Sequence, residues 1–196
     1  MNDVQIRTAL KREILLQYKD DRETVVIEEL GVHHGTSRID LAVVNGVLHG
    51  FELKSDRDTL TRLPEQANAY GLVFDRLTLV VAERHLRRAV DVLPDWWGIR
   101  VARGDAGNLS FRDLKLPMNN PSPDPFSVVS LLWRNEALSF LEELGGASGL
   151  HSRSRAEIYF ELVEKAAFNC LRDRVRRCLR DRRDWRSAGR RLSCGD

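Results

Sequence analysis

Hydrophobic and polar residues alternate with a period of two along residues 37–44, which is the pattern of a half-buried β-strand. The apolar face of this segment is formed by Ile39, Leu41 and Val43. The dipeptide Asn45-Gly46 follows, a strong signal for a tight hairpin turn, and residues 47–54 then alternate again. We therefore predict a β-hairpin that carries Asp40 on its polar side.

The length of the turn decides whether Asp40 shares a face with Glu52 and Lys54. A two-residue loop would place Asp40 and Glu52 on opposite faces of the sheet, because facing residues point to the same side. A three-residue loop, with Gly46 left-handed in a bulge, pairs Asp40 with Gly50 or Glu52 and gathers the three polar groups. We predict the three-residue loop.

Such a gathering of Asp40, Glu52 and Lys54 indicates a chemical site. Two carboxylates about 4 Å apart repel by roughly 4 kcal/mol at an effective dielectric constant near 20, so they need a shared proton or a bound cation. Carboxylate oxygens suit Mg²⁺, which binds through one or two carboxylates and keeps several waters. A metal-bound water beside a lysine is suited to phosphodiester hydrolysis.

A second motif follows on the next predicted helix, where Gln66 and Tyr70 lie four residues apart and therefore on one helical face. Together with Asp40 and Glu52-Leu53-Lys54, this motif resembles the PD-(D/E)XK nuclease superfamily. The Gln/Tyr pair points to its RecB-like branch. The resemblance covers roughly residues 4–82.

One position departs from the superfamily pattern, because Ile39 stands where the name-giving proline would be. Within the superfamily, residues 28–56 resemble a small prokaryotic group of mostly uncharacterised proteins. The resemblance implies a restriction-endonuclease-like three-layer α/β/α fold around a central mixed sheet. It also implies a Mg²⁺-dependent deoxyribonuclease, for which Mn²⁺ is expected to substitute.

The roles that the resemblance implies fall on the two motifs. Asp40, Glu52 and the Leu53 carbonyl bind Mg²⁺, Lys54 activates water, and Gln66 and Tyr70 position the backbone of the substrate. Glu29, at the end of the preceding strand, is expected to assist through water, with a solvated strand end as the alternative. A glutamate from the first helix reaches the metal site in many members, which makes Glu13 a candidate, with a solvated helix glutamate as the alternative.

The remaining pattern agrees with an α/β fold class. We expect a helix from Asn2 or Asp3 to about Tyr18, and strands at residues 24–27, 75–83, 99–102 and 109–111. A helix is expected to start at Asp58 or Thr59, and another near residues 85–90. Trp96 and Trp97 are expected to be core anchors rather than a base-stacking platform. This alternation predicts a mixed sheet between helical layers.

Closely spaced prolines at residues 117–125 mark a boundary. We predict a nuclease-like core at residues 1–116, a Pro-rich linker at 117–125 and a helical region at 126–196. The helices expected there cover residues 126–133, 135–144 and 154–183.

Charge is distributed unevenly along the chain. The net charge is +2, but residues 1–150 carry −4 and residues 151–196 carry +6. Residues 172–191 hold ten arginines and three aspartates, which indicates either phosphate contacts or a solvated helix face with Arg–Asp pairs. The candidate nucleic-acid contacts are Arg38, His34, Ser55, Arg176, Arg177 and Arg180.

Composition favours a cytoplasmic protein, because the three cysteines lack paired ligand spacing and neither an export signal nor an 18-residue apolar run is present. We expect a metal-dependent nuclease acting on DNA, with RNA and a homodimer left open. A non-catalytic nucleic-acid-binding or regulatory protein on the same fold is the alternative. A third possibility is an interaction protein whose helical tail binds another protein. Cleavage at ends or internally, and the biological pathway, stay undecided.

Overall fold

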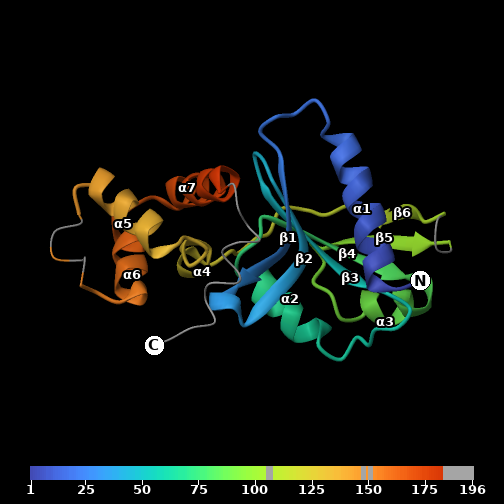
Figure 1. The fold of residues 1–196 in the computed structure, drawn as a ribbon. Helices are drawn as coiled ribbons and strands as arrows, with labels where there is room; N and C mark the ends of the chain where they lie inside the picture. The colour runs from blue at the N-terminus through green and yellow to red at the C-terminus, as the bar shows by residue number, and fades with distance from the viewer. Residues whose placement is uncertain (105–107, 147–148, 150–151, 183–196) are drawn as a thin grey trace.

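The computed structural model describes residues 1–104, 108–146, 149 and 152–182, and its strands form one six-stranded sheet in chain order (Figure 1). These strands are β1 (Val25–Val32), β2 (Ser37–Val44), β3 (Leu48–Lys54), β4 (Arg76–Ala82), β5 (Gly98–Arg103) and β6 (Ser110–Lys115). The first three strands pair antiparallel, β3, β4 and β5 pair parallel, and β6 returns antiparallel. The predicted mixed sheet is confirmed.

Helix α1 (Asp3–Gln17) covers one face of the sheet. Asn2 caps it, since its side chain accepts from the Gln5 N–H while the Gln5 side chain accepts from the Asn2 N–H. Its inward stripe packs on apolar residues of four strands, and the cluster consists of Ile6, Leu10, Ile14, Leu41, Val43, Phe51, Leu53, Val80 and Ala102. The expected first helix and its N-cap are confirmed.

The opposite face is covered by α2 (Leu63–Gly71), by α3 (Leu86–Val90) after a short 3₁₀ turn η2 (Glu83–His85), and by the C-terminal helices. Trp97 is fully buried there, as expected of a core anchor. The predicted start of α2 is wrong. The Asp58 carboxylate accepts from the N–H of Ser55 and closes a turn, so that the helix begins only at Leu63 with Pro64 in its first turn.

The C-terminal helices are α4 (Pro125–Val129), α5 (Arg134–Glu143), α6 (Arg155–Lys165) and α7 (Phe168–Asp181), gathered on one side of the molecule (Figure 1). The prediction of one long helix at 154–183 is wrong, because Ala166 and Ala167 are extended. This break lets α6 and α7 each turn an apolar stripe to the core, ending with Leu162 and beginning with Leu171. Residue 183 and the arginines after it lie outside the described residues.

The Pro-rich segment at 117–125 is bound to the end of α2 and to the loop that leads into β4. Asn120 donates from its side chain to the carbonyls of Gly71 and Phe74, and the N–H of Asp124 donates to the carbonyl of Leu72. Apolar residues of α4–α7 belong to the same buried cluster as one face of the sheet. The predicted α/β/α arrangement around a central mixed sheet, with a helical extension, is therefore confirmed, whereas the division into domains stays a prediction.

The hairpin turn has the predicted length. Val44 pairs with Leu48, which leaves residues 45–47 as a three-residue loop. Gly46 is not left-handed as we predicted, since its φ is not positive. The Asn45 side chain instead accepts from the N–H of Val47 at 3.1 Å, which closes the turn without a bulge.

The alternation along β2 breaks at Asp40, which corrects the prediction that Ile39 shares a face with Leu41 and Val43. Leu41 and Val43 pack below α1, but Ile39 packs in the cluster on the other face. The cause lies in β1, where Glu29 has a left-handed φ of 54° and the regular pairing skips Glu29 and Asp40. Asp40 therefore lies at a twist in the sheet.

His49 on β3 makes stability depend on pH. Its ring stacks on Phe51 and lies 2.9 Å from the Thr78 hydroxyl, and burial, then the charge of Arg76, lowers its pKa to about 3. An unfolded histidine titrates near 6.5, so the unfolded chain binds the extra proton between about pH 6.5 and 3. This contribution is complete above pH 6.5 and is lost as the pH falls.

We expect the His49→Gln variant to gain free energy of unfolding relative to the parent by about 1.4 kcal/mol for each pH unit below 6.5. Urea unfolding of both proteins between pH 5 and 8 measures the difference, in which the titration of all other groups cancels. Parallel curves over that range would contradict a neutral buried His49.

Candidate metal and phosphate site

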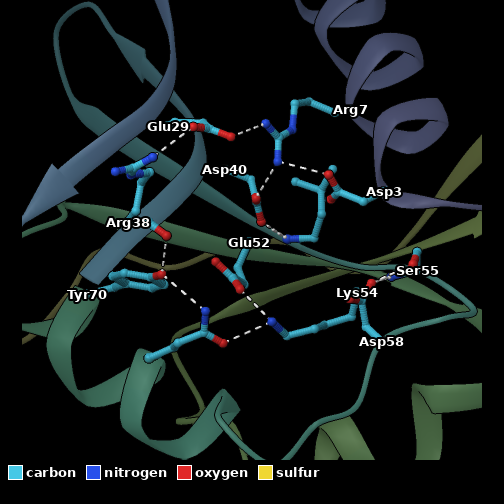
Figure 2. A network of polar contacts seen from close by, with 12 residues as sticks. Asp3, Arg7, Glu29, Arg38, Asp40, Glu52, Lys54, Ser55, Asp58 and Tyr70 are labelled. Carbon is cyan, nitrogen blue, oxygen red and sulfur yellow. Dashed lines mark hydrogen bonds and ion pairs between the residues drawn. The ribbon is translucent and has the colours of Figure 1, made fainter. Parts of the chain in front are cut away.

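Two carboxylates meet where β2 and β3 leave regular pairing. The last hairpin pair is Leu41 with Phe51, and the same register continued by one residue sets Asp40 beside Glu52. Asp40 Oδ2 accepts from the N–H of Leu53 at 2.8 Å, and Glu52 is almost completely buried. Figure 2 shows both side chains pointing into the same space. The structure thus brings the two predicted carboxylates together.

Lys54 is buried beside them. Its Nζ lies 2.6 Å from Glu52 Oε1 and 2.9 Å from Gln66 Oε1 (Figure 2). The ammonium is thus held between a carboxylate of β3 and an amide of α2. This arrangement fixes the direction of the lysine side chain.

The Gln66/Tyr70 face of α2 meets the polar side of the hairpin, as predicted. Gln66 Nε2 donates to the Tyr70 hydroxyl at 3.3 Å, and this hydroxyl donates to the carbonyl of Arg38 at 2.6 Å. The buried residues of the helix are Leu63, Ala67 and Tyr70. Tyr70 therefore fixes the path of β2, whereas Gln66 fixes Lys54.

One carboxylate oxygen of the site has no hydrogen-bond partner among the described residues. This atom is Oε2 of Glu52. The Tyr70 hydroxyl cannot supply the missing hydrogen bond, because it carries one proton and already donates it to the carbonyl of Arg38. A buried oxygen in this condition is costly, so it marks a place where a cation can bind.

Burial disfavours the ionised forms of both carboxylates. It raises the pKa of Asp40 to about 7, with the nearby charge of Glu52 as the next cause. Burial also raises the pKa of Glu52, although the Lys54 ammonium acts in the opposite direction. The two carboxylates therefore cannot both be ionised at low cost unless a cation joins them.

Arg7 of α1 is the site residue that we did not find from the sequence. Its Nη2 lies 2.9 Å from Asp40 Oδ1 and 2.9 Å from Asp3 Oδ2, and its Nη1 lies 2.7 Å from Glu29 Oε1. One signal was present, because Asp3 and Arg7 are four residues apart and Arg7 follows the buried Ile6. Its contact with Asp40 depends on how α1 lies across the sheet.

The two other glutamate candidates lie away from Glu52. Glu29 binds two arginines, with Oε1 on Arg7 and Oε2 at 3.0 Å from Arg38, rather than the paired carboxylates. Glu13 forms an ion pair with Arg100 of β5. In this structure Glu13 pairs with Arg100, and the residue that α1 brings to Asp40 is Arg7.

The predicted nucleic-acid contacts lie in different environments. Arg38 and Arg177 are exposed, as a contact residue must be. Ser55 is buried and donates its hydroxyl to Asp58, and its role as a nucleic-acid contact stays a prediction. His34 lies in the short 3₁₀ turn η1 (His33–Gly35), and its side chain lies outside what the structure describes.

Two C-terminal candidates hold α7 against the body of the protein. Arg176 donates to the carbonyl of Gly46 in the hairpin turn, and Arg180 lies 2.9 Å from Glu23. The guanidinium of Arg176 is largely buried and is used within the fold, and its role as a nucleic-acid contact stays a prediction. These two arginines dock α7 and do not form a solvated face.

The residues at the site fit a hard divalent cation of modest protein coordination. No group of three or more His, Cys, Asp or Glu side chains placed to hold a metal ion occurs in the described part of the chain. Mg²⁺ needs only one or two carboxylates, because it keeps waters and takes oxygens from the substrate. Asp40 and the unpartnered Oε2 of Glu52 supply that number.

Comparison with known proteins gives a family for this chain. The family model of bacteriophage P4 protein cII matches residues 4–189. The chain belongs to the bacteriophage P4 protein cII family. Protein cII of Enterobacteria phage P4 is 25% identical over 162 residues, covering 82% of this chain and 60% of that relative. The chain thus spans about 60% of the length of the family member it matches.

A similar solved structure is that of SfsA from Pyrococcus furiosus in complex with Ca²⁺. It is 13% identical, the match covers 59% of this chain and 65% of the SfsA chain, and the TM-score is 0.35. Separately, none of the helices described for this member of the cII family is long and apolar enough to cross a membrane.

Proposed function

We propose that this chain is a metal-dependent nuclease that hydrolyses phosphodiester bonds in DNA. The observation that carries the proposal is the buried Glu52–Lys54 pair beside Asp40, with one Glu52 oxygen left without a partner. Two costly features, a buried ion pair and a neighbouring carboxylate of raised pKa, occur at one place. The order of these residues in the chain matches the PD-(D/E)XK motif described above.

Asp40, Glu52 and the Leu53 carbonyl would hold Mg²⁺ or Mn²⁺. Such an ion supplies Lewis acidity toward a phosphate oxygen and lowers the pKa of a water that it binds. As the ammonium, Lys54 would orient this water and offset the charge that develops on the phosphate. As the neutral amine, it would accept the proton of the water and become the ammonium. Gln66 keeps Lys54 in place through the 2.9 Å contact.

The test is cleavage of labelled linear, nicked and single-stranded DNA by the pure protein. We expect cleavage with Mg²⁺ or Mn²⁺ and none in EDTA. The rate is expected to rise as the pH increases through about 7, because Asp40 must lose its proton before it can bind the ion. Mn²⁺ binding followed by calorimetry should release a proton at pH 6 and no proton at pH 8.5.

An Asp40→Asn variant is the matched control and should lose both the cleavage and the proton release. Metal-independent cleavage, or cleavage unchanged in Asp40→Asn, would contradict the proposal. RNA oligonucleotides in the same assay decide between the two nucleic acids.

A second candidate function is a non-catalytic nucleic-acid-binding protein on the same fold. The observation that favours it is Arg7, which already neutralises part of the charge of Asp40 from a buried position. DNA binding that is unaffected by EDTA, with no cleavage of any substrate, would support this candidate over the nuclease.

A further inference from the structure

Two guanidinium groups enclose one carboxylate next to the paired acids. Arg7 Nη1 lies 2.7 Å from Glu29 Oε1, and Arg38 Nη1 lies 3.0 Å from Glu29 Oε2. Each arginine therefore takes a different oxygen of the same anion. Figure 2 shows Glu29 between the two arginines, with Asp40 bound to the second Nη nitrogen of Arg7.

This carboxylate lies at the surface, unlike Glu52. The side chain of Glu29 is 46% exposed and that of Arg38 is 60% exposed, whereas Arg7 is 19% exposed. Hydrogen bonds from Arg7 and then Arg38 lower the pKa of Glu29, so the carboxylate is ionised at neutral pH. Solvent, and hence a ligand, has access to Arg38 and to the Glu29 carboxylate that covers Arg7 Nη1.

A phosphodiester presents the same acceptors as this carboxylate, namely two oxygens that share one negative charge. Arginine forms its strongest contacts with such paired oxygens, whether they belong to a carboxylate or to a phosphate. Because Glu29 and a backbone phosphate would accept hydrogen bonds from the same guanidinium N–H groups, they cannot bind these groups at the same time.

We propose that Arg7 and Arg38 form a binding site for a DNA backbone phosphate, and that the Glu29 carboxylate occupies this site until DNA displaces it. The proposal rests on the proposed function for its substrate class. Arg7 also contacts Asp40, so the phosphate would lie beside the carboxylates that hold the metal. Glu29 is then a competitor of the substrate and no longer the water-mediated helper that its position in the sequence predicts.

The test reverses the effect expected of a catalytic acid. In EDTA, fluorescence anisotropy with a fluorescein-labelled DNA duplex should show that Glu29→Gln binds about threefold to tenfold more tightly than the parent at low salt. The slope of log K against log salt concentration should steepen by about one, as for one added phosphate contact. A metal-binding or solvated Glu29 predicts no such change in slope.

Glu28→Gln is the matched control, because it removes the same charge from the neighbouring residue, whose partner is Lys11. It should leave the slope unchanged, and a gain equal to that of Glu29→Gln would overturn the proposal. An Arg38→Gln change in the Glu29→Gln background should remove the gain. Parent-like or weaker binding by both Glu29→Gln and Glu29→Ala would also overturn it.

The outcome is separate from that of the nuclease proposal. Anisotropy in EDTA reports phosphate binding without catalysis, whereas the cleavage assay with Mg²⁺ reports the chemistry. Tighter binding by Glu29→Gln in a protein that does not cleave DNA would keep the phosphate site and reject the nuclease.

Discussion

Replacing Lys54 with alanine is expected to lower the rate of DNA cleavage by about 10²-fold to 10⁴-fold, the usual contribution of a positioned general acid or base. The lysine ammonium is the cation held between Glu52 and Gln66, at 2.6 and 2.9 Å. Alanine removes both the group that would orient the attacking water and the charge that would face the phosphate. The measurement is the initial rate of cleavage of labelled DNA with Mg²⁺.

Lys11→Ala is the control for this variant. Lys11 also pairs with a glutamate, Glu28, but it does so on the partly exposed face of α1. Its loss should leave the rate within about twofold, because surface ion pairs contribute little. Circular dichroism would check that the Lys54→Ala protein is folded, and cleavage by it at the parent rate would refute the assignment.

Replacing Asp75 with alanine is expected to cost about 3 kcal/mol or more of unfolding free energy. This carboxylate is buried at the start of β4. It accepts from the N–H of Leu48 at 2.7 Å and from the Arg172 guanidinium, and Arg176 Nη1 lies 4.0 Å away. The variant leaves an N–H and an arginine of α7 without their acceptor, which is the expensive way to break a buried pair.

Urea unfolding of Asp75→Ala measures this cost, which is a large part of the 5–15 kcal/mol that typically stabilises a domain. Asp173→Ala is the comparison. Asp173 lies on α7, is 70% exposed and pairs with Arg176 of the same helix at 3.3 Å. We expect that variant to lie within about 0.5 kcal/mol of the parent. A similar small effect for both variants would show that Asp75 does not hold α7 in place.

The hairpin could be predicted from sequence because its determinants are local. Alternation and Asn45-Gly46 fixed the strands, and the requirement that Asp40 and Glu52 meet selected the three-residue loop. The conformation of Gly46 was not predicted, because the Asn45 side chain closes the turn in place of a left-handed glycine. The placement of residues that depend only on one or two neighbouring strands could therefore be predicted from the sequence.

The contacts of the arginines could not be predicted from the sequence. Whether Arg7 contacts Asp40 depends on how α1 lies across the sheet, and a helix pattern only gives the buried stripe. Arg176 and Arg177 are adjacent in a run of basic residues, yet one bonds to the hairpin turn and the other is exposed. Glu29 could not be placed because a left-handed φ at a glutamate has no sequence signal.

The contact between Arg176 and the carbonyl of Gly46 joins the last described helix to the turn that sets the register of Asp40 and Glu52. Adding or deleting one residue in that turn would invert the facing of one strand and also move the carbonyl away from the helix. Insertions and deletions there are thus doubly constrained, although the turn itself bears no reacting group. The length of this surface loop is therefore constrained by the site that it positions.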